Sequence, residues 1–122
     1  MPSFDERARA WDDDPRKVQR ANDIAEAIAR RVPLVPTMRA LEYGCGTGLV
    51  SFALAERLGD ITLADTSHGM LEVAGEKAQR FGARSGGRTM ATLHVDLCTD
   101  PLPAVRYDLL YSSMTLHHIP DT

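Results

Sequence analysis

Apolar residues recur along the first third of the chain with the spacing of an amphipathic helix. Asp14 and Pro15 are typical of a helix start, because an aspartate caps the free amides of the first turn and proline suits the first helical position. The apolar residues that follow are spaced by three or four positions: Val18, Ala21, Ala25, Ile28 and Val32. Pro33 and Pro36 interrupt the pattern, so we expect one helix over 15–32.

Short apolar stretches with the character of buried strands alternate with helical patterns along the rest of the chain. The predicted strands are 38–43, 60–65, 89–96 and 107–113. The predicted helices are 49–59, which Gly59 should end, and 66–82, for which Thr66 and Ser67 are cap candidates. This alternation predicts a parallel sheet with helices on its faces and right-handed crossovers. Ligands of such sheets bind at the carboxyl ends of the strands.

Composition and charge exclude several classes of protein. The chain has 122 residues, enough for one domain, and a net charge of −3 without a block of basic residues, so neither nucleic acid nor a membrane is an expected partner. No apolar run approaches the roughly 20 residues that span a bilayer, and the acidic N-terminus does not resemble a signal peptide. Cys45 and Cys98 lack the spacing of metal ligands, so we expect no metal site and a reducing, cytoplasmic setting.

Glycine occupies every second position between the strand 38–43 and the helix 49–59, at Gly44, Gly46 and Gly48. Such a loop lets a ligand lie against bare backbone, and the following helix directs its amides to the same point. The third glycine comes one residue too early for a dinucleotide fingerprint, and the residues after it are not those of a phosphate-binding loop. We also expect no lysine or arginine close to the loop. The pattern therefore favours a polar ligand without a phosphate anchor.

Two acids follow the next two predicted strands. Asp65 lies 21 residues after Gly44, where a carboxylate can accept hydrogen bonds from both hydroxyls of a ribose. Asp96 ends the third predicted strand, where an acid can accept from the exocyclic amine of a base. Together with the glycine loop they describe an adenosine site. Each acid also has a simpler interpretation, Asp65 as a helix cap and Asp96 as a loop residue.

In this order the stretches LEYGCGTG, LADTSHGML, LHVDL and YDLLYSSMTLHHIPD resemble the motifs of class I S-adenosylmethionine-dependent methyltransferases, especially the small-molecule, ubiquinone- and menaquinone-type domains. The resemblance implies a Rossmann-like three-layer α/β/α fold with strand order 3-2-1-4, truncated relative to the seven-stranded family fold. It implies one domain over 1–122, with an N-terminal lid segment and helix over 1–37 and a cofactor-binding core over 38–122 that is incomplete at its C-terminus. The fourth strand would then be an open apolar edge: either the chain is the N-terminal portion of a longer enzyme, or a second copy or another partner covers this edge.

The resemblance also assigns residues to the cofactor, S-adenosyl-L-methionine, whose product is S-adenosyl-L-homocysteine. The implied binding residues are Glu42, Gly44, Cys45, Gly46, Gly48, Asp65, Thr66, Met70, Asp96, Leu97, Ser112 and Met114. Among them, Glu42 would shape the loop and orient the cofactor's amine, although an ion-pair or capping role is an equal alternative. Cys45 is interpreted as a packing residue rather than a nucleophile. Trp11 is either part of the lid or an anchor for the first helix.

The predicted function is in-line transfer of a methyl group to a small-molecule acceptor, with His117 as the candidate general base. Two alternatives belong to other classes. The chain could be a non-catalytic S-adenosylmethionine-binding fragment or interaction module, or an NAD-dependent oxidoreductase with an irregular glycine loop.

Overall fold

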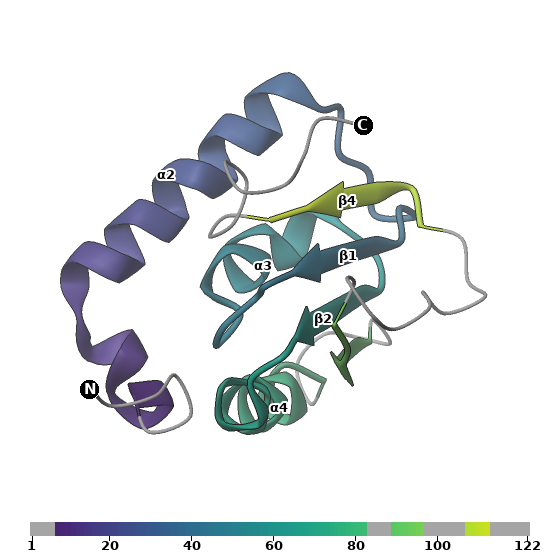
Figure 1. Cartoon of the computed structure of the whole chain (residues 1–122). Helices are drawn as coiled ribbons and strands as arrows, with labels where there is room; N and C mark the ends of the chain where they lie inside the picture. Colours follow the sequence, from purple (N-terminus) through teal and green to yellow (C-terminus); the bar gives the residue numbers. More distant parts are fainter. Residues whose placement is uncertain (1–6, 83–88, 97–106, 113–122) are drawn as a thin grey trace.

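Four parallel strands form the sheet at the centre of the structure (Figure 1). The computed structural model describes residues 7–82, 89–96 and 107–112. The strands are β1 (Ala40–Tyr43), β2 (Ile61–Asp65), β3 (Met90–His94) and β4 (Leu109–Tyr111), paired in the order β3-β2-β1-β4. This order and the parallel pairing confirm the predicted Rossmann-like sheet. All four strands therefore end at one edge, where the glycine loop follows β1, Asp65 ends β2 and Asp96 comes shortly after β3.

The helices of the described part of the chain are η1 (Ala8–Asp13), α2 (Pro15–Arg31), α3 (Leu49–Leu54), η2 (Ala55–Arg57) and α4 (His68–Gly82). The predicted start of α2 is confirmed, because the Asp14 carboxylate accepts a hydrogen bond from the Arg16 amide at 2.9 Å. Ser67 caps α4, since its hydroxyl accepts from the Met70 amide at 3.2 Å. None of these helices is both long enough and apolar enough to cross a membrane.

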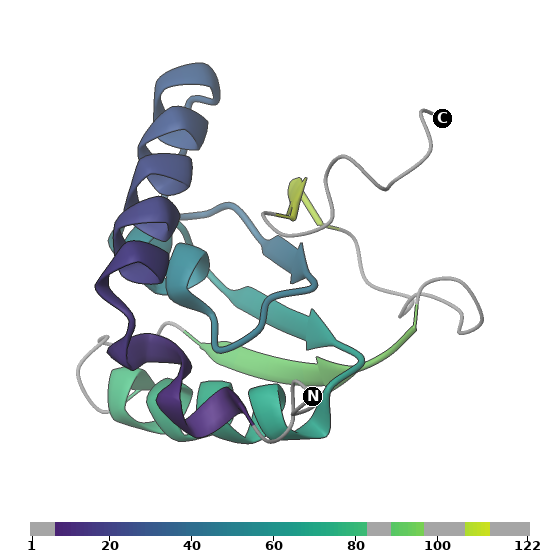
Figure 2. The same ribbon diagram turned by 60° about the vertical axis from the view of Figure 1, so that its left-hand side comes forward.

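The main core lies between the sheet and these helices, which pack against one of its faces (Figure 2). Ala40, Ile61 and Leu63 on this face contact the apolar sides of α2, α3 and α4. A smaller cluster of Leu41, Ala64 and Val95 lies on the opposite face. The alternation of β1 thus places Glu42 on the helical side, in the same layer as Ala40.

The second predicted helix is shorter than the sequence pattern suggests. It ends as α3 at Leu54 and tightens into the turn η2, and Gly59 has no left-handed backbone of the kind that ends a helix. A Cβ atom on Gly59 would lie 2.6 Å from the Pro36 carbonyl oxygen and 2.9 Å from that of Met38. The predicted role of Gly59 as a helix stop is therefore wrong. Glycine is needed there because the segment before β1 passes so close.

Candidate functional site

The glycine loop between β1 and α3 depends on a left-handed backbone at three alternating positions. Gly44, Gly46 and Gly48 have φ angles of 67°, 57° and 88°. The Cys45 amide donates to the Ala64 carbonyl of β2 at 3.0 Å, which ties the loop to the neighbouring strand. Because L-residues disfavour this conformation by about 1–2 kcal/mol each, the three glycines make a tight, fixed turn possible. The loop is thus preformed at the carboxyl edge of the sheet.

Asp65, at the end of β2, points into this loop. One of its carboxylate oxygens accepts a hydrogen bond from the Gly46 amide at 2.8 Å, and the other accepts from the Ser67 amide at 2.9 Å. An ionised carboxylate has about four acceptor sites, so two remain for further donors such as ligand hydroxyls. Its role in the turn before α4 is therefore compatible with binding a diol.

The other residues expected after β2 and β3 gather at the same edge. The Val95 amide donates to the Asp65 carbonyl at 3.1 Å, so Asp96, the next residue, follows close to the end of β2. Thr66 is exposed, and its carbonyl oxygen lies 2.9 Å from His94 Nε2. Met70, in contrast, is only 2 % exposed and lies beneath the surface of the site.

Glu42 is a carboxyl group enclosed between β1 and α3. It is completely buried, and its Oε1 accepts a hydrogen bond from the Ser51 hydroxyl at 2.6 Å. Among the residues that the structure describes, Oε2 of Glu42 is the one buried side-chain oxygen or nitrogen that lacks a hydrogen-bond partner. Burial raises the pKa of Glu42 to about 7, and the hydrogen bond from Ser51 only partly offsets this effect. The site thus contains an acceptor that is not satisfied by the protein.

Cys45 in the loop and Ser112 directly after β4 are both buried, 6 % and 7 % exposed. The Cys45 thiol donates to the Gly46 carbonyl at 3.2 Å, and burial raises the pKa of this thiol far above its usual range. A thiol held protonated is a poor nucleophile. The structure therefore agrees with interpreting Cys45 as a packing residue of the loop.

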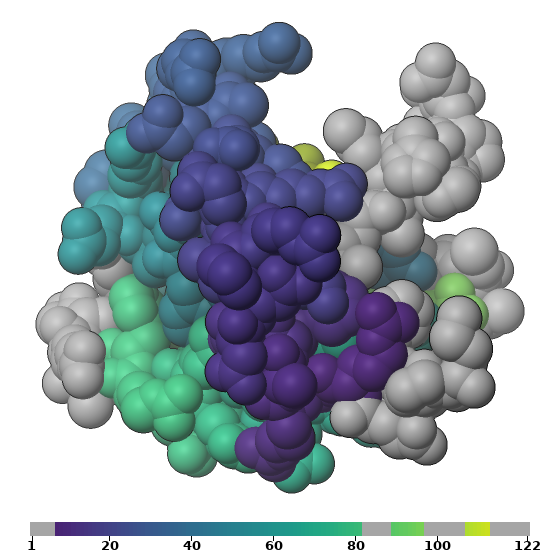
Figure 3. All heavy atoms as spheres, turned by 90° about the vertical axis from the view of Figure 1, so that its left-hand side faces the viewer, coloured from purple at the N-terminus to yellow at the C-terminus, as the bar shows by residue number. Residues whose placement is uncertain are grey.

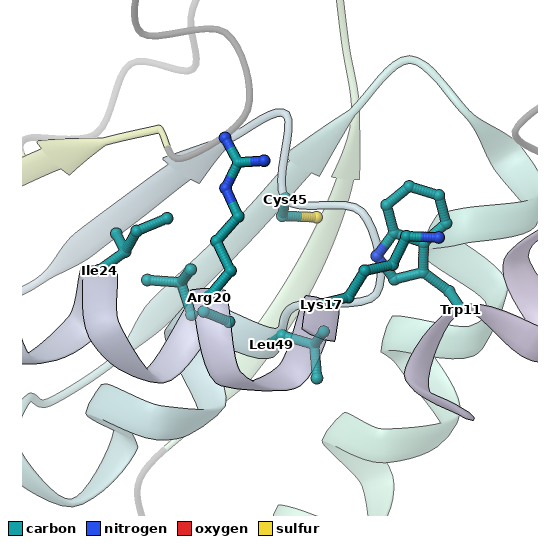
Figure 4. A pocket seen from close by; sticks show the side chains of 8 residues that line it. Trp11, Lys17, Arg20, Ile24, Cys45 and Leu49 are labelled. Carbon is teal, nitrogen blue, oxygen red and sulfur yellow. The ribbon is translucent and has the colours of Figure 1, made fainter. Parts of the chain in front are cut away.

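A pocket of about 190 Å³ opens between α2 and the glycine loop (Figure 4). Its lining residues are Trp11, Lys17, Arg20, Ala21, Ile24, Cys45, Leu49 and Val50. The expectation that no lysine or arginine lies near the loop is wrong, because α2 brings Lys17 and Arg20 to it. Lys17 lies over the Trp11 ring, 3.8 Å from its centroid, whereas the Arg20 guanidinium makes no ion pair with the described residues.

The segment η1 is fastened across this region by charged side chains. Asp12 accepts a hydrogen bond from the Thr47 hydroxyl of the loop and pairs with Lys77 of α4 at 2.7 Å. Arg9 pairs with Glu72 at 2.5 Å and Glu76 at 2.8 Å, also on α4. Figure 3 shows these N-terminal residues packed over the outer surface beside α4. We call η1 the strap; with Trp11 it forms one wall of the pocket.

Residues 40–122 match the family described as "Methyltransferase domain", which is more than half of the chain. The chain belongs to this family. Curated relatives include an uncharacterized methyltransferase of Mycobacterium bovis, 35% identical over 84% of this chain and 48% of that protein. Another is a ubiquinone biosynthesis O-methyltransferase of Marinobacter nauticus, 32% identical over 99% of this chain and 51% of that protein. This chain thus spans about half the length of these relatives.

Solved structures of the same fold also match the domain. A protein of Methanococcus maripaludis superposes with a TM-score of 0.75 at 23% identity, covering 99% of this chain and 55% of that one. Magnesium protoporphyrin IX methyltransferase from Synechocystis, solved with bound S-adenosylmethionine, gives a TM-score of 0.64 at 23% identity over 84% and 47% of the two chains. Membership of the class I S-adenosylmethionine-dependent methyltransferases is confirmed, and S-adenosylmethionine is the cofactor of that class.

The predicted site residues of the methyltransferase domain fall into two groups. Those from Glu42 to Met70, with Asp96 and Ser112, are described, and among them Gly46 of the loop is hydrogen-bonded to Asp65. Leu97, Met114 and His117 lie outside the described residues. Sequence reasoning missed Arg20, Lys17 and the Asp12–Thr47 contact. The three-residue step from Lys17 to Arg20 places them on one helix face, but nothing in the pattern indicates that this face meets the loop.

Proposed function

We propose that this methyltransferase domain binds S-adenosylmethionine at the carboxyl edge of its sheet and takes part in methyl transfer to a small molecule. The observation that carries the proposal is the contact between Asp65 and the Gly46 amide. It places a carboxylate with spare acceptor sites against a loop of bare backbone. Across the same loop, Arg20 offers a cation that makes no ion pair with the described residues. A nucleoside with an amino-acid tail matches this set of groups.

For the nucleoside part, we propose that Asp65 accepts hydrogen bonds from the ribose hydroxyls. Thr66 would line the sugar and base, with Met70 packed beneath them, and Asp96 and Leu97 would meet the adenine. The position of Asp96 directly after Val95 supports this, since Val95 is bonded to the Asp65 carbonyl. Two acids at neighbouring strand ends can thus serve a diol and an exocyclic amine at the same time.

For the amino-acid part, we propose that the α-carboxylate lies in the pocket beside Arg20 and the ammonium is drawn to Glu42. Pockets for whole drug-sized ligands hold roughly 300–1,000 Å³. A pocket of about 190 Å³ therefore suits one end of the cofactor. The buried Oε2 of Glu42 lacks a partner, and an ammonium, or a water that it holds, would supply the donor.

The chemistry requires mainly position from the protein. When bound, the cofactor supplies a methyl group on a sulfonium, which an acceptor displaces in line. Gly44, Cys45, Gly46 and Gly48 would hold the cofactor from below, and Ser112 and Met114 would lie near the sulfonium. His117 remains our candidate for the base that removes the acceptor's proton.

A small organic molecule is the proposed acceptor. Support comes from the relatives, one of which is a ubiquinone biosynthesis O-methyltransferase, and from the net charge of −3, which opposes binding of nucleic acid. We also propose that a second copy or a partner covers β4, where Leu110 is 61% exposed. Gel filtration tests this: a monomer at high concentration with no partner contradicts it. A cytoplasmic setting remains a prediction from the sequence.

Titration calorimetry of the chain with S-adenosylhomocysteine, and separately with NAD, tests the proposed function. We expect binding of S-adenosylhomocysteine and none of NAD. Arg20→Gln should weaken the affinity at least tenfold, because hydrogen bonds to charged groups contribute roughly 1.5–3 kcal/mol. Arg16→Gln is the matched control, since this side chain lies on the same helix with 93% exposure and away from the pocket. Binding of NAD alone would overturn the proposal.

Binding without turnover would favour the alternative of a cofactor-binding module. Incubation with labelled S-adenosylmethionine and a panel of phenols, amines and carboxylic acids distinguishes the two. Transfer to any acceptor supports the enzyme, whereas tight binding with no labelled product over the whole panel supports the module.

A further inference from the structure

A series of hydrogen bonds between hydroxyl groups connects β4 to the buried carboxyl group of β1 through α3. Glu42 and Tyr111 are register partners on the adjacent parallel strands, and both point to the helical face. Ser51 of α3 lies between them, with its Oγ 2.6 Å from Glu42 Oε1 and 2.5 Å from the Tyr111 hydroxyl. Ser51 and Glu42 are completely buried, so the hydrogen bond between them is shielded from solvent, whereas Tyr111 is partly buried.

The direction of these hydrogen bonds follows from the chemistry of the groups. An ionised carboxylate only accepts, so Ser51 must donate its single hydroxyl proton to Glu42. Ser51 can then only accept, and Tyr111 must donate to it. Burial raises the pKa of Tyr111 far above its usual range, so the phenol keeps its proton throughout neutral pH. Successive hydrogen bonds of this kind polarise one another and favour the charged carboxylate.

The charged and titratable groups around Glu42 come from three other elements. Asp65 of β2 opposes its ionisation, and Lys77 of α4 favours it, both more weakly than burial does. Cys45 in the loop is a neutral thiol, because its pKa is raised. Burial therefore opposes the negative charge most strongly, and the Ser51 hydroxyl is the nearest group that supports it.

We propose that Ser51 and Tyr111 are positioning residues for the cofactor, which hold Glu42 by Oε1 and keep its unpartnered Oε2 ready for the ammonium of the methionine part. This inference rests on the proposed function, since it assigns the support for one contact of the same site. Removing either hydroxyl leaves the nucleoside contacts of Asp65 in place. The loss should therefore be confined to ligands that carry an ammonium group.

Calorimetry over pH 5.5–8.5 tests the proposal with two probes, S-adenosylhomocysteine and 5′-methylthioadenosine, which lacks the amino-acid part. In the wild type the affinity for S-adenosylhomocysteine should rise with pH through about 7, as Glu42 ionises. In Tyr111→Phe this midpoint should move upward by about one pH unit, and in Ser51→Ala by about 1–2 units, because the direct donor is lost. Affinity for 5′-methylthioadenosine should stay unchanged in both variants.

Tyr107→Phe is the matched control, because this tyrosine lies 3.5 Å from Thr62 and on the other face of the sheet. It should retain the wild-type midpoint. The same midpoint in Ser51→Ala, Tyr111→Phe and the wild type would overturn the positioning role and leave the proposed function standing. Parallel loss of both probes in folded variants would show a merely structural role. If the wild type binds neither probe, the proposed function itself fails.

Discussion

The floor of the site and the strap are held in place by different forces. The floor is the glycine loop with Asp65. It is fixed by the left-handed backbone of the glycines and by hydrogen bonds from the loop amides of Cys45 and Gly46 to β2. The strap η1 is held by ion pairs of Arg9 and Asp12 to α4 and by the hydrogen bond from the Thr47 hydroxyl to Asp12. Arg9 is largely exposed, and exposed ion pairs contribute little and are screened by salt.

The difference indicates which part of the site is rigid. Replacing a loop glycine should alter folding and binding together, because the loop needs a left-handed backbone at these positions. Changes in the strap should alter how fast the cofactor enters and leaves, while the fold stays intact.

The largest effect should come from the buried carboxyl group of β1, two residues before the glycine loop. Glu42 has a raised pKa of about 7 in the folded protein, so between about 4.5 and 7 the folded state binds more protons than the unfolded state. Its contribution to stability is therefore present at low pH and lost as pH rises, by on the order of 3 kcal/mol over this window. In Glu42→Gln this part of the pH dependence should be absent. Urea unfolding at a series of pH values measures this dependence. If the free energy of unfolding changes with pH equally in the two proteins, the pKa of Glu42 is not raised.

Replacement of one loop glycine should be the next most damaging change. A Cβ atom on Gly48, at a φ of 88°, would lie 3.0 Å from the Phe52 ring. We expect Gly48→Ala to lower the free energy of unfolding by about 2 kcal/mol and to abolish binding of S-adenosylhomocysteine. Gly75→Ala within α4 is the control, since its Cβ would meet nothing closer than 3.9 Å, and it should stabilise by about 0.5–1 kcal/mol. Urea unfolding of both variants measures whether each lowers or raises the free energy of unfolding. Equal changes would refute the need for glycine at position 48.

Loss of the Asp65 charge should weaken binding more than folding. Asp65→Asn keeps one acceptor oxygen but loses the charge, so we expect at least a tenfold weaker affinity for S-adenosylhomocysteine by calorimetry. Asp60→Asn is the control, because Asp60 also accepts a backbone amide, that of Thr89 at 3.0 Å, but at the opposite end of β2. It should bind normally. If both variants bind alike, Asp65 does not contact the ligand.

The strap should give the smallest effects. Lys77 is only 16% exposed in its pair with Asp12, so Lys77→Gln should raise the dissociation rate of S-adenosylhomocysteine several-fold and lower stability by about 1 kcal/mol. Arg9→Gln should change neither measurably, because its ion pairs are exposed. Stopped-flow kinetics at low and high salt check this. A larger effect of Arg9 than of Lys77 would show that the outer ion pairs hold the strap.

The floor was predictable from the sequence because its determinants are local. Alternating glycines after an apolar strand indicate a tight loop, and the spacing of Asp65 places it at the next strand end. Asp14 and Pro15 likewise mark the start of α2 from their own chemistry. Strand order followed from the family resemblance and the handedness of crossovers.

The position of the strap could not be predicted from the sequence in this way. The contact of Asp12 with Thr47 spans 35 positions and that with Lys77 spans 65, and no local pattern selects such partners. For the same reason the face of α2 that carries Arg20 gave no indication that it meets the loop. Gly59 was misinterpreted because a close approach of Pro36 and a helix stop both select glycine.

The glycine loop and Asp65 together are proposed to hold an adenosyl ligand. Amide chemical-shift mapping by NMR during a titration with S-adenosylhomocysteine tests it most directly. We predict that the amides of Gly44, Gly46 and Gly48 and of Ser67 shift together with one binding constant, while those of Gly59 and Gly75 stay in place. Shifts confined to the surface between α4 and β3, with the amides of the loop glycines unmoved, would show that the ligand does not bind at the loop.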